Sequence, residues 1–246
     1  MGVHGGPDIV EDGLIFAVDA GNEQCWQPNT NTSGSCTSLI NSLEYTGSLI
    51  NDVSGSLGEA GSWVFSSSLS SSLNFPNDIG VNGLTEASCF CWVNSNSIAT
   101  NKAIAVKWDY QTQGCFGFQT DNSTVGELRV FIADAADDNA SNHTYTSNAN
   151  LASNTWYYVG FVYDGSQGAS NDRIEIYVDG VKKSKAYNGT INTSLIAATA
   201  TFKIAQFGGS LDREWNGKIA NCQIYNKALT TAEVTQNYNA TKQRFI

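Results

Sequence analysis

Hydrophobic and polar residues alternate in short runs along most of the chain, and clusters of Gly, Ser, Asn and Asp separate these runs. In the run 87–94, Phe90 and Trp92 fall on one face of an extended strand, and Cys89, Cys91 and Val93 fall on the other. A strand that is apolar on both faces is typical of the middle of a packed sheet. The pattern therefore predicts a central, doubly covered strand here.

A second run predicts a hairpin. Ile174, Ile176 and Val178 share the buried face of the run 174–178, and Asp179-Gly180 follows directly. This dipeptide suits a two-residue hairpin turn, because both of its positions need φ > 0. The chain is therefore expected to reverse direction at residues 179–180.

One segment, 231–238, has a helical pattern, and Thr230 with Glu233 forms a capping box at its start. The strands that we expect are 14–19, 63–65, 72–75, 87–94, 103–108, 115–119, 127–132, 156–163, 174–178, 201–207 and 218–225, and the runs 35–40 and 47–51 are further candidates for short edge strands. Many short strands and one short C-terminal helix predict an all-β fold of two antiparallel sheets packed face to face. We expect a flexible, Gly-rich arm at 1–12 and a single domain at 13–246.

Composition narrows the classes of partner. A length of 246 residues suits one all-β domain. The net charge is −10, and no Lys/Arg cluster offsets it, so we expect no nucleic-acid partner. The first twelve residues lack a basic region and an apolar run, which predicts no signal peptide. No apolar run approaches the length of a membrane span.

The six cysteines do not predict a zinc site, because no Cys-x-x-Cys pair occurs and the two histidines, His4 and His143, are far from any cysteine pair. We expect His143 in a polar loop. Cys89 and Cys91 point to one face of a strand, about 7 Å apart at the rise of a strand. Most of the thiols are expected to be buried and free. The sequence leaves open whether Cys25 and Cys36 form a disulfide bridge.

Three motifs carry a resemblance to a known family. They are Trp156 to Tyr163, Tyr177 to Val181 (Tyr-Val-Asp-Gly-Val), and Gly217 to Leu229, which the predicted helix follows. Together they resemble the laminin-G-like branch of the concanavalin A-like jelly rolls, which implies a jelly-roll sandwich over about 14–241. The chain departs from that pattern at Asn221, where relatives often carry Asp, and at 65–75, where a carboxylate-rich motif is missing.

The resemblance implies a Ca²⁺ site at the rim of the sandwich. Asp109 follows a predicted middle strand and Asp212 lies in a late rim loop, so these two are the metal candidates. The run 134–139 is a separate acidic loop, and a solvated loop is the competing interpretation of both clusters.

Sugar binding uses exposed aromatic rings beside polar groups, because a pyranose has one apolar face and several hydroxyls. The ligand-binding candidates near the loops are Trp108, Tyr110, Arg213 and Trp215, although Trp215 also suits the core. Trp63, Trp92 and Trp156 are assigned to the core.

The motifs of catalysis are missing from the sequence. There is no Glu-x-Asp-x-Glu run that would place two carboxylates on one strand beside a glycosidic bond. There is no Gly-x-Ser-x-Gly elbow, no P-loop and no dinucleotide-binding glycine motif. The sequence therefore predicts a protein that is not an enzyme.

The two ends carry a narrower resemblance. Residues 1–22 and 236–245 are similar to stand-alone laminin-G-like virion proteins of tailed bacteriophages. This implies a structural or surface protein of a phage-like virion, such as a capsid decoration, fibre or tail component. Its partners would be capsid or tail proteins, and it would adhere weakly to host glycans. The resemblance is also compatible with a homo-oligomer. The alternative is a free or cell-surface carbohydrate-binding lectin.

Overall fold

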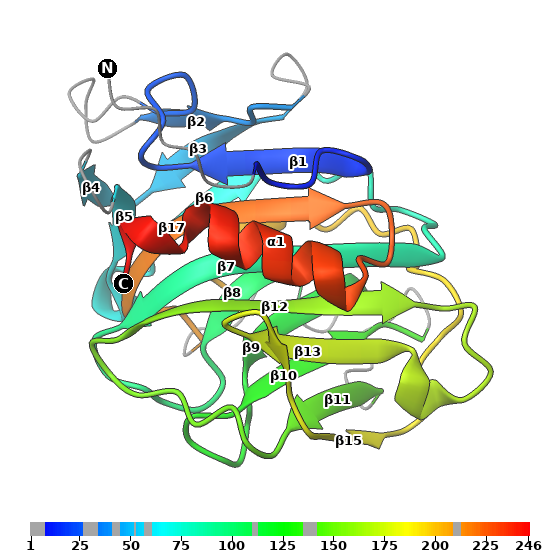
Figure 1. The fold of residues 1–246 in the computed structure, drawn as a ribbon. Helices are drawn as coiled ribbons and strands as arrows, with labels where there is room; N and C mark the ends of the chain where they lie inside the picture. Colours follow the sequence, from blue (N-terminus) through cyan, green and yellow to red (C-terminus); the bar gives the residue numbers. More distant parts are fainter. Residues whose placement is uncertain are drawn as a thin grey trace.

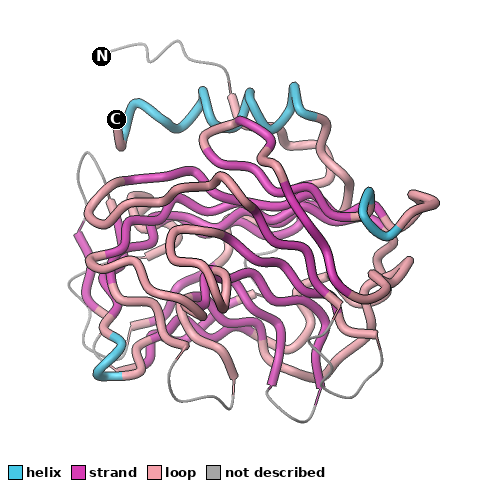
Figure 2. Tube along the Cα trace, turned by 90° about the horizontal axis from the view of Figure 1, so that it is seen from below, coloured by secondary structure: helices cyan, strands magenta, loops and turns pink. Residues whose placement is uncertain are grey.

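A computed structural model describes residues 8–26, 34–40, 45–51, 53–56, 61–109, 113–134, 142–208 and 213–246. Within these residues the strands form two antiparallel sheets, one of eight strands and one of nine, packed face to face (Figure 1). Figure 2 shows the α-helix of the described residues lying against the outside of the stacked strands. The predicted all-β, jelly-roll-like sandwich with one short C-terminal helix is confirmed.

The eight-stranded sheet has β7 and β17 at its centre, and β1 pairs with β17 outside the main path. Its strands in spatial order are β14 (Val181–Lys182), β13 (Ile174–Val178), β12 (Trp156–Asp164), β7 (Glu86–Ser95), β17 (Gly217–Tyr225), β5 (Ser62–Phe65) and β4 (Ser54–Ser56), with β1 (Leu14–Asp19) beside β17. The Asp179-Gly180 turn joins β13 to β14, and both residues have positive φ, as the sequence predicts.

The nine-stranded sheet contains two strands that the sequence pattern did not indicate, β11 and β15. Its order is β15 (Lys185–Asn188), β11 (His143–Thr146), β10 (Leu128–Ile132), β9 (Gln113–Thr120), β8 (Ala103–Asp109), β16 (Phe202–Ile204), β6 (Ser72–Phe75), β3 (Thr46–Ile50) and β2 (Ser35–Thr37). The prediction that His143 lies in a loop is wrong, because this residue begins β11 and pairs with β10 and β15.

The main core lies between the two sheets, and β7 is apolar on both faces, as predicted. Cys89, Cys91 and Val93 face the core between the sheets. Phe90 and Trp92 face outward and form a second cluster under the helix. Trp63 and Trp92 are fully buried, whereas Trp156 is only partly buried, at the edge of the second cluster.

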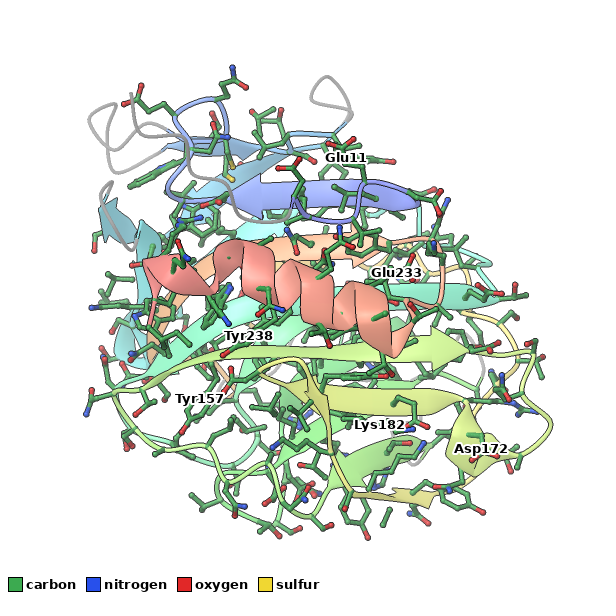
Figure 3. All side chains as sticks on the ribbon, viewed as in Figure 1. Glu11, Tyr157, Asp172, Lys182, Glu233 and Tyr238 are labelled. Carbon is green, nitrogen blue, oxygen red and sulfur yellow. The ribbon has the colours of Figure 1, made fainter. Side chains whose placement is uncertain are left out.

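Helix α1 (Thr231–Thr241) covers the outer face of the eight-stranded sheet. Thr230 and Glu233 form the predicted capping box at its first turn. Figure 3 shows Tyr238 beside α1 and over the eight-stranded sheet, and its ring stacks on Trp92 with ring centres 5.9 Å apart. Three single-turn 3-10 helices, Ser67–Leu69, Ser170–Asp172 and Lys242–Arg244, complete the regular structure of the described residues.

Both described ends of the chain pack on this helix side, and we call their contacts the terminal interface (residues 8–12 and 236–245). The buried side chain of Asn237 accepts from the Val10 amide at 2.7 Å and donates to the Tyr225 hydroxyl at 3.0 Å. Phe245 stacks on Trp92 with ring centres 4.4 Å apart.

The terminal interface includes part of the arm that the sequence predicts to be flexible, residues 1–12. Residues 8–12 contact the helix side rather than extending away from it, and residues 1–7 lie outside the described part of the chain. No helix in the described ranges combines the length and apolarity that a bilayer crossing requires.

Candidate functional site

The outer face of the nine-stranded sheet carries a graded surface, apolar at one end and polar at the other. Strand register places Gln119, Arg129 and Tyr145 in one row across β9, β10 and β11. The next row holds Phe131 and His143 on neighbouring strands. Their sequence neighbours on β10 face the main core, so these side chains point away from it.

Aromatic residues fill the apolar end of this face. Trp108 packs edge-on against Phe131 at 4.9 Å, and Phe207 completes a cluster that is separate from the main core. Two glycines on β9 make the space for these rings. A Cβ at Gly114 would lie 2.2 Å from Trp108, and a Cβ at Gly117 would lie 2.0 Å from Phe131. The glycines therefore let both rings pack close to the strand, and the cluster is closed to solvent.

The polar end of the face holds a pocket of about 290 Å³, which we call the polar pocket. It is lined by Asp121, Asn122, Ser123, His143, Tyr145, Tyr187 and Asn188. These residues come from the end of β9, from β11 and from the edge strand β15, so three segments distant in sequence meet there. The lining combines aromatic rings with amide, hydroxyl, imidazole and carboxylate groups.

Hydrogen bonds fix the charged groups around the polar pocket. Arg129 donates from Nη2 to His143 Nδ1 at 2.9 Å, so the imidazole carries its proton on Nε2. The carboxylate of Asp121 accepts from the Ser123 amide, the Ser123 hydroxyl and the Thr124 amide at 2.7 to 3.1 Å. Burial opposes ionisation of Asp121, but these hydrogen bonds lower its pKa overall, so it faces the pocket as a carboxylate.

Arg129 links the two sides of the pocket electrostatically. Burial lowers the pKa of its guanidinium, and the charge of Asp121 acts in the opposite direction. A guanidinium remains protonated under these conditions, so a buried cation lies between Asp121 and His143. The lining of the pocket therefore offers hydrogen-bond donors and acceptors, and the buried cation of Arg129 contacts one lining residue, His143.

Two of the sequence-predicted ligand residues are buried, which corrects their assignment. Trp108 has no exposed surface and belongs to the apolar cluster, and Trp215 is 1% exposed in the main core. Neither ring offers a face to a sugar in this structure. Tyr110 and Asp212 lie outside the described residues, so their predicted roles stay predictions.

The other two predicted residues border the apolar cluster rather than the polar pocket. Arg213 places its guanidinium over Phe207 at 4.6 Å. Asp109 ends β8, and its carboxylate lies 3.7 Å from the ammonium of Lys203. The Lys203 ammonium therefore partly neutralises the Asp109 carboxylate. The structure therefore groups Arg213 and Asp109 around the apolar cluster that contains Trp108, and none of these three lines the polar pocket.

Calcium stays a prediction, since Asp109 is the one member of the predicted pair that the structure describes. Within the described ranges, one set of three or more His, Cys, Asp or Glu side chains lies close enough to share a metal ion: Cys89, Cys91 and Cys222. These are buried thiols, whereas Ca²⁺ binds oxygen ligands. The cluster therefore gives no support to a calcium site.

A second depression of about 440 Å³ lies on the outer face of the eight-stranded sheet, beside the start of α1. The charged groups of its lining are tied to neighbouring residues. Glu175 pairs with Lys185 at 3.0 Å, and Arg173 donates to the carbonyl oxygens of Gln167 and Ile191. Asp172, another lining residue, is labelled in Figure 3 and ends the 3-10 helix that precedes β13. This depression is built mainly of groups that hold its own loops in place.

The residues of the polar pocket were missed in the sequence. Asn122 and Asn188 lie in Asn-x-Ser/Thr triplets of a chain rich in these residues and were not singled out, and His143 was assigned to a loop. A usable signal was present in His-Thr-Tyr-Thr (143–146), where His143 and Tyr145 alternate with small polar residues. The run is too short to separate a strand from a turn without its sheet neighbours.

Comparison with solved structures gives neighbours that share the fold. Domain 4 of AbnA, an extracellular arabinanase from Geobacillus stearothermophilus solved with arabinotriose, matches with 17% identity and a TM-score of 0.56, over 93% of this chain and 100% of that chain. The binding domain of Paraclostridial Mosquitocidal Protein 1 matches with 14% identity and a TM-score of 0.62, over 93% and 52%.

Trypanosoma rangeli sialidase matches with 13% identity and a TM-score of 0.60 over 97% of this chain, but the chain spans only 34% of that protein. At these identities the likeness shows the fold alone. Comparison with curated proteins found no match. The family model of the concanavalin A-like lectin/glucanases superfamily (Laminin_G_3) matches residues 67–235, more than half of the chain. The match runs from the turn before β6 to the middle of α1, and the chain belongs to this family.

Proposed function

We propose that this protein binds a carbohydrate in the polar pocket and does not cleave it. The observation that carries the proposal is the pocket lining, in which two aromatic rings on β11, His143 and Tyr145, lie beside amide and carboxylate groups. A sugar ring has an apolar face that packs on aromatic surfaces and hydroxyls that need donors and acceptors.

The size of the pocket suits a small sugar unit. Its volume of about 290 Å³ lies just below the roughly 300–1,000 Å³ that is typical of small-molecule pockets. Asn188 can both donate and accept, and the Asp121 carboxylate can accept from a hydroxyl. Family membership and the arabinanase domain solved with arabinotriose support the same class of ligand.

The proposal excludes cleavage on chemical grounds. Glycoside hydrolysis commonly requires a general acid with a raised pKa together with a second carboxylate. Among the residues that the structure describes, Asp121 is the one carboxylic acid in the lining of the polar pocket, and its hydrogen bonds lower its pKa. It is therefore a poor proton donor and a suitable acceptor for a sugar hydroxyl. Release of reducing sugar from a polysaccharide panel would refute this part.

A glycan array tests the binding, followed by calorimetric titration with arabinotriose and with each array hit. We expect at least one hit, and a loss of at least tenfold in affinity, about 1.4 kcal/mol, for His143→Ala and Asn188→Ala. Val181→Ala is the control, because Val181 is 59% exposed on the other sheet. No binding to any glycan, or equal affinity in all variants, would overturn the proposal. Repeating the array with EDTA tests the predicted calcium.

The finer proposal is that this binding protein sits on the surface of a phage-like virion, in contact with capsid or tail proteins. It is supported by the sequence of residues 1–22 and 236–245. In this chain, residues 8–12 and 236–245 also have a folding role in the terminal interface. The alternative is a free or cell-surface lectin. Mass spectrometry of purified particles distinguishes the two proposals. If the particles lack this protein, the virion proposal is refuted and the lectin proposal stands.

A further inference from the structure

Two of the six cysteines lie within reach of a covalent bond. Cys25 and Cys36 are buried, and their sulfur atoms are 3.0 Å apart. Cys25 lies in the turn that follows β1, and Cys36 is the middle residue of β2. The Thr37 amide donates to the Cys25 carbonyl at 2.8 Å, which holds the two backbones side by side. The closeness of the sulfurs is therefore set by main-chain pairing.

Packing on both sides holds this arrangement. The Asp19 amide donates to the Cys25 sulfur at 3.3 Å. The next residue, Trp26, packs edge-on against Trp63 at 6.3 Å and closes over Gly55, where a Cβ would lie 2.5 Å from the indole. The turn that carries Cys25 is thus anchored in the core, and the thiol has little freedom to move away from Cys36.

We propose that Cys25 and Cys36 form a reversible disulfide that joins the two sheets at this edge of the sandwich. The turn that carries Cys25 continues from β1 in the eight-stranded sheet, and Cys36 lies in the edge strand of the nine-stranded sheet. The sulfurs need to approach by about 1 Å to reach the bond length of ~2.05 Å. A bridge here would tie the edge strand β2 to the body of the fold.

The bond requires an oxidant, which we take to be a small-molecule disulfide such as oxidised glutathione. One cysteine thiolate attacks it and releases one reduced glutathione, and the second cysteine then displaces the other from the mixed disulfide. Two protein thiols are oxidised and two glutathione thiols form. Burial raises the pKa of Cys36 and so disfavours its thiolate, which makes the reaction slow in the folded chain. We therefore expect the bond to form during folding.

The test refolds the fully reduced wild-type chain in a glutathione redox buffer, blocks free thiols with N-ethylmaleimide under denaturing conditions and maps peptides by mass spectrometry. We expect one bridge, Cys25–Cys36, with the other four cysteines alkylated. Cys89, Cys91 and Cys222 are the competitors, since their sulfurs lie within 4.8 Å of one another. A bridge within that set, or six alkylated cysteines, would overturn the proposal.

A second measurement uses thermal unfolding of oxidised and reduced protein. The bridge closes a loop between residues 11 positions apart, and it should raise the melting temperature by about 6–11 °C. Cys25→Ser and Cys36→Ser should remove this difference. Cys115→Ala, which removes a buried thiol from β9, should keep it. An equal oxidised–reduced difference in Cys25→Ser and the wild type would contradict the assignment.

Discussion

Replacing Asn237 with alanine should destabilise the fold by removing the link between the two ends and the eight-stranded sheet. The Asn237 side chain is fully buried and bonds the Val10 amide at 2.7 Å and the Tyr225 hydroxyl at 3.0 Å. Val10 is 8% exposed and Tyr225 is fully buried, so both groups lose their partner away from bulk water. Each buried polar group left unsatisfied costs roughly 1–3 kcal/mol. The expected loss in the free energy of unfolding is therefore about 2–6 kcal/mol.

Urea unfolding followed by tryptophan fluorescence measures this loss. We expect a lower midpoint with an unchanged slope, since the variant should bury the same surface. Asn239→Ala is the matched control, because it changes the same residue type on the same helix, where Asn239 only accepts from Lys242 at 2.8 Å. The control should lose less than about 0.5 kcal/mol. If Asn237→Ala is as stable as Asn239→Ala, the terminal interface does not stabilise the fold in this way.

Gly117→Ala should lower the free energy of unfolding by about 2 kcal/mol or more, because its Cβ would lie 2.0 Å from the Phe131 ring. Chemical denaturation measures this loss, and the control Gly168→Ala, which has open space around it, should be about as stable as the wild type. A double-mutant cycle on Arg244 and Asp19, joined at 2.6 Å and 3.0 Å, should give a coupling of about 0.5–1 kcal/mol that shrinks in 1 M salt; a coupling that salt leaves unchanged would contradict an electrostatic origin. The lowered pKa of Asp121 stabilises the fold above its unfolded pKa of about 3.9, and this contribution disappears as pH falls through the folded value. The stability difference between wild type and Asp121→Asn, measured by denaturation from pH 6 to pH 2, should therefore narrow toward acid, and a constant difference would refute the cause.

Local sequence patterns predicted the parts of the fold that local chemistry decides. The strand around Phe90 shows as a run of apolar residues on both of its faces. The capping box joins Thr230 to a residue three positions later, and the turn at Asp179-Gly180 depends on the φ angles of two adjacent residues. Each of these signals lies within a few neighbouring residues. Each was therefore readable without knowledge of the rest of the chain.

The candidate site depended on contacts between distant segments, which the sequence does not display. Trp108 reads as an aromatic residue near a loop, but Gly114 and Gly117 on the neighbouring strand open the space that buries its ring cluster. His143 stands in a short polar run that becomes a strand only because β10 and β15 pair with it. Tertiary pairing of this kind overrides a weak local pattern.

Helix α1 lies on one broad side of the sandwich (Figure 2), together with the terminal interface. The polar pocket is lined by residues of the other sheet, on its outer face. Because Phe245 packs against Trp92, the C-terminal end of the described chain lies on the helix side. Protein immobilised by a tag joined to this end would rest on its helix side. The face with the polar pocket would then point into solution, so surface-based glycan assays should use a C-terminal attachment rather than random coupling through lysines.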